Sequence, residues 1–444
     1  MTLRKQAISL AVMHGVDALQ PLLVLPYAAR ILGPHQFGKF AYAVSIGQFA
    51  VTFVGYGFHW TAQRSVSSIR RDPAAVSSLF ADVVAAQVVL LISVLIVGLA
   101  VSDSVFGLSR SLFLCVMLTA AGVVLFPAWL FIGLELAWKA ATAVAVARCL
   151  ALVCFLTMVR SASQVELAVA IQSAVPLISA FVALPFILQI GFGGFRGITF
   201  DRIKLQFIRG WRGFLYTLVE RALIALPVPL VEHFSGYAAA GQYSIAEKFV
   251  TATRTFYRVI TETLLPRVAY YARHNPQAGI YLIQRSLTTL FLGAALSISL
   301  FFIAPYIIVL VFGPTYAPAI PIVRVMAIIP LLLNANICMS NLYMFNYGHE
   351  RVWAHLSVAG LLVFFGTAYL LAPYLANAAI AVAIGVAAKE GVVLIVSVGF
   401  FLNCEIGRGR RVAAARVNVI AAGAGHVGSA PAVAFRSDQL RTEP

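Results

Sequence analysis

Apolar segments about as long as a membrane is thick recur along the whole chain. Each holds roughly 20 residues, which is enough for a helix to cross about 30 Å of hydrocarbon. Because lipid offers no hydrogen-bond partner to the backbone, a spanning segment must be a helix or a strand of a closed barrel. The segments are too long and too continuously apolar for the roughly 10-residue alternation of barrel strands. The sequence therefore predicts an all-α polytopic membrane protein.

Composition agrees with this fold class, since 61% of the 444 residues are hydrophobic and 11% are charged. A water-soluble globule cannot bury that much apolar surface. The basic start, Met1 to Lys5, is similar to a signal peptide, but Asp17 and Pro21 interrupt the apolar stretch that follows it. We interpret this region as a first span.

The sequence contains twelve apolar segments, and each begins and ends near charged residues, glycine or proline. The predicted spans are residues 7–30, 38–62, 79–101, 111–132, 139–159, 166–190, 211–231, 241–265, 286–311, 318–345, 352–373 and 376–402.

Basic residues gather on one side of these spans. If the N-terminus is cytoplasmic, 21 lysines and arginines lie in inside segments, and four (Arg30, Lys39, Arg110 and Arg160) lie outside. This bias predicts that both termini are cytoplasmic. Because the net charge of +16 sorts by membrane side, no nucleic-acid partner is expected.

The chain is predicted to divide into two six-helix halves. The predicted parts are an N-terminal lobe 1–190, a basic cytoplasmic linker 191–210, a C-terminal lobe 211–402 and a disordered cytoplasmic tail 403–444. Two short echoes support duplication. Leu25-Pro26 before Gly38 matches Leu226-Pro227 before Gly241, and a G-x-E-x-x-W pattern begins at both Gly133 and Gly348. Parallel repeats of this kind are typical of transporters.

The eighth predicted span carries a stripe of charged and polar residues at intervals of three or four: Glu247, Thr251, Arg254, Arg258 and Glu262. They lie on one helix face, and Lys248 stands beside it. Charge at membrane depth costs at least about 2.5–3.5 kcal/mol per residue, so this face is expected to line a protein interior or a hydrated cavity. An internal salt-bridge ladder, Glu247 with Arg254 and Arg258 with Glu262, is the alternative.

The second predicted span has a polar face of its own. It comprises Ser45, Gln48, Thr52, Tyr56, His59 and Gln63. Equivalent polar faces in the two halves suggest a shared central cavity. Ordinary interhelical hydrogen bonding is the alternative.

Cations predominate among the charges within spans, and they are the candidate substrate-binding residues: Arg148, Arg221, Lys248, Arg254, Arg258, Arg324 and Lys389. Arginine binds phosphate oxygens with two donors, so the expected cargo is an anion. The candidates for proton or ion coupling are Asp17, Glu220, Glu247 and Glu262. For each of these charges a satisfied ion pair remains the alternative.

Motifs for other chemistries do not occur in the sequence. It contains no P-loop, G-x-S-x-G or H-E-x-x-H motif, and its five cysteines have no metal-ligand spacing. We therefore expect no catalytic residue, metal or cofactor.

Several blocks resemble the Wzx-type oligosaccharide flippases, the polysaccharide transporter branch of the multidrug/oligosaccharidyl-lipid/polysaccharide (MOP) superfamily. The blocks are Leu25-Pro26-Tyr27, Arg30-Ile31-Leu32-Gly33-Pro34, Phe37-Gly38, Tyr56-Gly57-Phe58 with Arg64, Gly241 to Lys248, Phe312 to Ala317, and Asn334 to Glu350. The resemblance covers most of residues 1–402 and is diffuse between the blocks.

The resemblance implies two six-helix lobes in an inverted V, in a bacterial inner membrane, working by alternating access. It further implies flipping of undecaprenyl-diphosphate-linked oligosaccharide through a cationic cavity for O-antigen or exopolysaccharide synthesis. A polysaccharide polymerase and chain-length machinery are the partners expected besides the lipid bilayer.

Two other functions are weighed against flipping. A proton- or sodium-coupled drug or cation antiporter of the same superfamily should have a site dominated by carboxylates. A membrane-embedded polymerase or ligase needs a sizeable external loop, and every predicted external connection is short.

Overall fold

The computed structural model describes residues 3–189 and 198–424, and within these ranges every regular element is a helix. The all-α prediction is therefore confirmed. The chain divides into two units, Met1–Leu394 and Ile395–Pro444.

The elements of the first half are α1 Leu3–Gly55, α2 Phe58–Ile69, α3 Pro73–Val101, α4 Arg110–Leu125, α5 Ala128–Gly133, α6 Ala137–Met158, η1 Ala162–Gln164, α7 Val165–Ser173 and α8 Val175–Gln189. Those of the second half are α9 Phe200–Ala225, α10 Pro227–His274, α11 Pro276–Ser286, α12 Thr289–Ile307, η2 Ile308–Phe312, η3 Pro314–Tyr316, α13 Ala319–Met326, α14 Ile329–Ile337, η4 Cys338–Met344, α15 Glu350–Leu371, η5 Ala372–Tyr374 and α16 Ala378–Ala424.

Ten segments within the described residues are long and apolar enough to cross a membrane. Two of them contain a backbone break, at Gly33 in Leu23–Gly55 and at Gly236 in Phe200–Arg254. Because α1 itself begins at Leu3, dividing α1 at Gly33 and Phe200–Arg254 at Gly236 gives twelve helical segments in the described residues, the number predicted. The chain is a multi-pass membrane protein.

The breaks at Gly33 and Gly236 are alike in geometry and position. Gly33 has φ 71° and ψ 169°, and Gly236 has φ 77° and ψ 179°. Glycine adopts positive φ without steric cost, so each break needs it. Each break lies five residues before a second glycine, Gly38 or Gly241.

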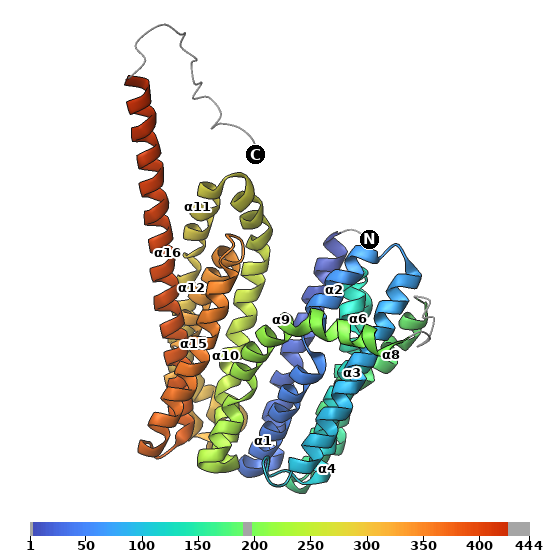
Figure 1. Cartoon of the computed structure of the whole chain (residues 1–444). Helices are drawn as coiled ribbons and strands as arrows, with labels where there is room; N and C mark the ends of the chain where they lie inside the picture. Colours follow the sequence, from blue (N-terminus) through green and yellow to red (C-terminus); the bar gives the residue numbers. More distant parts are fainter. Residues whose placement is uncertain (1–2, 190–197, 425–444) are drawn as a thin grey trace. The chain divides into compact units, whose positions relative to one another are not determined.

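The helices α1 and α10 cross where these second glycines meet, and Figure 1 shows the two helices alongside each other. A Cβ added at Gly38 would lie 1.6 Å from the carbonyl oxygen of Tyr237, and one at Gly241 would lie 3.0 Å from that of Pro34. Tyr237 and Pro34 each follow a break glycine. The contact is therefore reciprocal, which supports the proposed duplication.

The helix α9 runs from α3 and α8 toward α10 (Figure 1). Its first turn is fixed to α3 by Arg202, whose Nε and Nη2 donate to Oδ2 of buried Asp82 at 3.0 and 2.8 Å. Because α9 then continues to Ala225, it carries its last turns to the helices of the second half.

Apolar packing within Met1–Leu394 forms two main clusters. One joins α1, α4 and α7 to α10, α13 and α14, and the other lies on α2, α3, α5 and α6. The core thus includes apolar contacts between the two halves of the sequence, with the α1–α10 crossing among them.

Two predicted segment boundaries differ from the observed helices. Residues 191–197 of the predicted linker lie outside the described part, whereas Phe200–Gly210 already belongs to α9. The helix α16 continues from Ala378 to Ala424, past the predicted start of the tail at residue 403. Alanine and arginine, which are frequent there, are strong helix formers. The rest of the tail lies outside the described residues.

Candidate functional site

A polar cavity of about 480 Å³ lies within the second half of the chain. Its lining comes from α9, α10, α14, η4, α15 and α16. The lining residues are Tyr216, Glu220, Arg221, Leu223, Ile224, Thr251, Arg254, Leu333, Asn336, Ile337, Ser340, Asn341, Trp353, Ser357, Phe364, Val386, Lys389, Glu390 and Val393. This size is within the range of small-molecule sites.

Five charged residues line this cavity. Arg221, Arg254 and Lys389 are cationic, and Glu220 and Glu390 are anionic, so the formal charge of the lining is +1. Placing this many charges at membrane depth is expensive unless they meet water, partners or a ligand. The excess of cations favours an anion as that ligand.

The most buried charge is the Glu390 carboxylate, whose residue is 2% exposed. Lys389 Nζ lies 2.5 Å from its Oε1, and Asn336 Nδ2 donates to its Oε2 at 2.6 Å. The same Nδ2 donates to the Glu390 backbone oxygen at 3.0 Å. Arg254 also acts on this carboxylate through its charge. Three elements, α10, α14 and α16, thereby meet at one side chain.

Four of the predicted site residues belong to this lining besides Glu220: they are Arg221, Thr251, Arg254 and Lys389. Thr251 and Arg254 are neighbours on the predicted stripe of α10, and the lining around them comes from five other elements. Glu247 of the same stripe pairs instead with Lys248, whose Nζ is 3.4 Å from its Oε2. The side chains of Asp17, Arg258 and Glu262 lie outside the described residues.

The other predicted cations whose side chains the structure describes do not line this cavity. Arg148 Nη1 donates to the side-chain oxygen of Gln20 at 2.9 Å, in the first half of the chain. Arg324 is exposed, and its guanidinium carbon lies 5.5 Å from the ring centre of Phe301. Lys248 has the partner Glu247 described above.

The polar face predicted on residues 38–62 is split between α1 and α2. Buried Ser45 donates to the backbone oxygen of Ala225, and Thr52 donates to that of Gln48 at 3.3 Å. The side chain of Gln48 is exposed. The Ser45 bond is the ordinary interhelical hydrogen bonding that was the alternative to a cavity, whereas the Thr52 bond lies within α1.

His59 of the same predicted face lies on α2 after the break at Tyr56 and Gly57. Its ring contacts Trp60 with centroids 4.9 Å apart, and the charge of Arg221 acts on it. His59 is therefore within electrostatic range of Arg221, a cation of the cavity.

Sequence reasoning did not assign Glu390 and Asn336 to the site. Glu390 stands next to Lys389 in a span, which marked it as a buried charge but left its role open. Asn336 has a polar amide side chain within a predicted span, and this placement is the sequence feature that could have identified it as a site residue.

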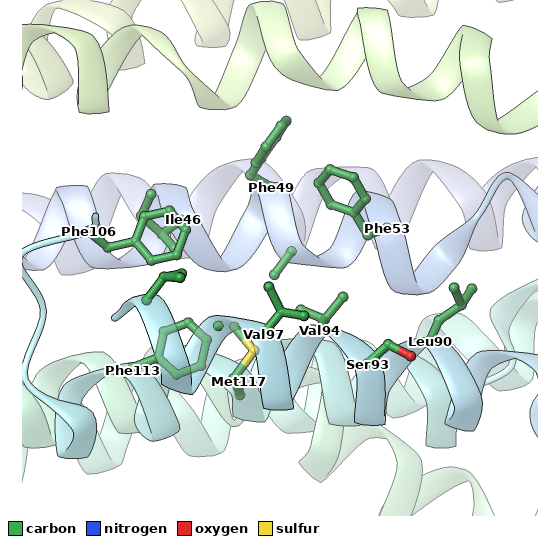
Figure 2. Close-up of a pocket in the computed structure, with 13 residues that line it drawn as sticks. Ile46, Phe49, Phe53, Leu90, Ser93, Val94, Val97, Phe106, Phe113 and Met117 are labelled. Carbon is green, nitrogen blue, oxygen red and sulfur yellow. The ribbon is translucent and has the colours of Figure 1, made fainter. Parts of the chain in front are cut away.

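An apolar pocket of about 450 Å³ lies in the first half, between α1, α3 and α4. Figure 2 shows Phe106 and Phe113 close to Ile46 at one end, and Leu90 with Ser93 at the other. Ser93 is the polar side chain among its lining residues. The two halves of the chain thus differ in the chemistry of these pockets.

Known proteins share both the sequence pattern and the fold. The family model for "Polysaccharide biosynthesis protein" matches residues 3–272. A protein of Escherichia coli (strain K12) is 27% identical over 82% of this chain and 88% of its own length, and one of Shigella dysenteriae is 20% identical over 84% and 93%. Both bear the name "Putative O-antigen transporter".

Among solved structures, an inward-facing multidrug resistance MATE family transporter of the MOP superfamily gives a TM-score of 0.67. At 15% identity it covers 89% of this chain and 95% of its own. An outward-facing MATE family transporter gives 0.57 at 16% identity, with 91% and 94% covered. These likenesses show the MOP fold.

The family match covers more than half of the chain, and the predicted resemblance to the Wzx-type branch of the MOP superfamily is confirmed with it. This chain belongs to the polysaccharide biosynthesis protein family.

Proposed function

We propose that this protein flips undecaprenyl-diphosphate-linked oligosaccharide units across a bacterial inner membrane for O-antigen or exopolysaccharide synthesis. Its family and the printed names of its two relatives support a cargo of this class. The observation that carries the proposal is the cavity with three cations, Arg221, Arg254 and Lys389, inside an apolar helical protein. Its excess positive charge suits a diphosphate.

Alternating access is the proposed mechanism. Two six-helix lobes, residues 1–190 and 211–402, would tilt about the reciprocal glycine crossing of α1 and α10. The cavity would then open toward one leaflet at a time, with both termini cytoplasmic. A polymerase and chain-length machinery are the proposed users of the flipped unit.

Proton coupling through Glu220 is part of this proposal. Glu220 is exposed and lines the cavity beside Arg221, so its carboxyl group is accessible from the site. The coupling candidates Asp17, Glu247 and Glu262 are proposed with it.

A drug or cation antiporter is the second candidate, since the solved structures with this fold include multidrug transporters. Such a cargo needs net negative charge at its site, whereas this lining carries +1. The charge balance therefore favours the flippase.

Deletion of the gene tests the function directly. We expect labelled lipid-linked oligosaccharide to accumulate on the cytoplasmic leaflet and surface polysaccharide to disappear. Normal translocation with short polymer chains would instead identify a polymerase.

Arg254→Ala tests the cationic site in the complemented deletion strain. We expect export to fall about 10- to 100-fold, because a charge-assisted hydrogen bond contributes about 1.5–3 kcal/mol. The matched control is Arg267→Ala, an exposed arginine of the same helix that is not among the cavity-lining residues. Export at the control's level in the Arg254→Ala strain would remove Arg254 from the site.

A further inference from the structure

The cavity described above contains its own anion. The Glu390 carboxylate has an ion pair with Lys389, a hydrogen bond from Asn336 and the charge of Arg254 beside it. Two of these groups, Lys389 and Arg254, are also cations of the cavity lining. A phosphoryl group that entered would thus meet cations already engaged by a carboxylate.

The amide of Asn336 has a fixed orientation. Its nitrogen faces two acceptors of Glu390, the backbone oxygen and Oε2, so the amide cannot be reversed without losing both bonds. This leaves Asn336 Oδ1 buried with no hydrogen-bond partner, on a residue that is 3% exposed. Arg254 Nε is a second buried atom without a hydrogen-bond partner.

These two atoms require opposite partners. Arg254 Nε needs an acceptor, as a phosphoryl oxygen provides, and Asn336 Oδ1 needs a donor, as a sugar hydroxyl provides. Leaving a buried polar atom unpaired costs about 1–3 kcal/mol. A phosphate ester that carries a neighbouring hydroxyl group offers both kinds of partner.

We propose that Glu390 is a resident counter-ion that competes with the phosphoryl group of the cargo for Lys389 and Arg254. This inference rests on the proposed function and adds a specific role to it. With the cavity empty, Glu390 and Asn336 hold the cations in place and neutralise one of them. When the anion binds, its oxygens replace Glu390 as the partner of these cations, and the carboxylate's repulsion limits how tightly the anion is held.

Competition of this kind serves release. A transporter must let its cargo go on the second side, and a lining charge of +2 without Glu390 would bind a diphosphate more tightly than one of +1. Glu390 therefore acts as a positioning residue for Lys389 and Arg254 and as the source of a weaker, reversible site.

Glu390→Gln tests this role, because glutamine keeps the shape and accepts from Asn336 but lacks the charge. Inorganic pyrophosphate and farnesyl diphosphate are titrated calorimetrically into the full-length purified protein, with farnesol as the phosphate-free probe. We expect Kd for both phosphorylated probes to fall on the order of tenfold. Export in cells should slow, with a lower apparent KM, because release becomes harder.

Matched variants separate charge from structure. Glu350→Gln removes the same charge from an exposed position on α15 that is not among the cavity-lining residues, and should leave Kd unchanged. Glu390→Asp keeps the charge but shortens the reach to Lys389, so pyrophosphate should bind about threefold tighter. The aspartate protein provides the test if Glu390→Gln fails to fold.

The possible results distinguish the inference from the proposed function. The counter-ion role would be overturned if the wild-type protein bound the phosphorylated probes and folded Glu390→Gln bound them with equal or weaker affinity. The flippase proposal would then still stand. Wild-type protein that bound neither phosphorylated probe would overturn both. Farnesyl diphosphate binding more tightly than pyrophosphate would identify a lipid headgroup as the ligand, and equal affinities would point to free phosphate compounds.

Discussion

At the scale of single residues, the central feature is the adjacent pair Lys389 and Glu390 on α16. Neighbouring residues on a helix point about 100° apart, so they do not ordinarily face each other. Here the flexible lysine stem brings Nζ to 2.5 Å from Glu390 Oε1, and Asn336 holds the other carboxylate oxygen from α14. A buried carboxylate needs several partners at once, and Glu390 finds them at the cavity wall in Lys389 and Asn336.

Asn336→Leu should destabilise the protein, because it removes two hydrogen bonds to Glu390, one to its buried carboxylate and one to its backbone oxygen. We expect a loss of about 1–3 kcal/mol in the free energy of unfolding, measured as a lower midpoint of thermal unfolding in detergent. Ser340→Ala is the control, since Ser340 lines the same cavity but bonds only locally, to the backbone oxygen of Ile337 and the side chain of Asn341. Equal stabilities of the two variants would show that Asn336 does not support Glu390.

At the scale of helices, the central feature is the crossing of α1 and α10, where the two backbones come into contact. Backbone meets backbone there because Gly38 and Gly241 have no Cβ, and the breaks at Gly33 and Gly236 direct the two helices to this point. Any tilting of one half against the other must be accommodated here.

Gly38→Ala should impair both folding and export, because its Cβ would lie 1.6 Å from the carbonyl oxygen of Tyr237. Relief requires α1 and α10 to move apart, so we expect destabilisation of about 1–3 kcal/mol from overpacking. Gly366→Ala is the matched control in a spanning helix with nothing within 4 Å of its Cβ, and it should be neutral or stabilising by about 0.4–1 kcal/mol. Thermal unfolding and surface polysaccharide are the measurements. Wild-type behaviour of Gly38→Ala would argue against a close crossing.

At the scale of the whole molecule, the distribution of basic residues is the basis of the proposed orientation. The proposed twelve spans place both termini and the segment around Arg202 on the cytoplasmic side, and the segment around Arg160 outside. The multi-pass fold is shown by the ten apolar segments and their two breaks.

Reporter fusions test this orientation. Green fluorescent protein attached after Ala424 should fluoresce, and alkaline phosphatase attached there should be inactive, because each folds on one side of the membrane. Alkaline phosphatase inserted after Arg160 should be active. The opposite pattern at either position would require an odd number of spans or a reversed orientation.

Much of the fold could be predicted because the length of an apolar spanning segment is set by the thickness of the membrane alone. The approximate position of each span follows from that length. The sequence shows glycines at Gly33 and Gly236, but it does not predict the helix breaks at these positions, since positive φ depends on how the helices pack. The extent of α9 was also missed, because its amphipathic first turns look like a basic linker until Asp82 of α3 is there to bind Arg202.

The candidate site was predictable in part. Helical periodicity put Thr251 and Arg254 on one face of α10, and both line the cavity. Arg148, Arg324 and Lys248 were grouped with Arg254 because they are cations within predicted spans, although they contact Gln20, Phe301 and Glu247 instead. Periodicity shows which residues share a face of one helix, but which helix covers that face is a property of the packing.

The sequence by itself determined that this protein lies in a membrane, that it is helical and that cations are in excess within its apolar spans, because these properties depend on local length, polarity and charge. The tertiary structure decided which of those charges meet. Arg221 and Arg254 come from the consecutive helices α9 and α10, whereas Lys389 and Glu390 come from the distant helix α16. They line one cavity because these three helices pack there with α14 and α15. Long-range contacts of this kind leave no periodic trace in any single segment.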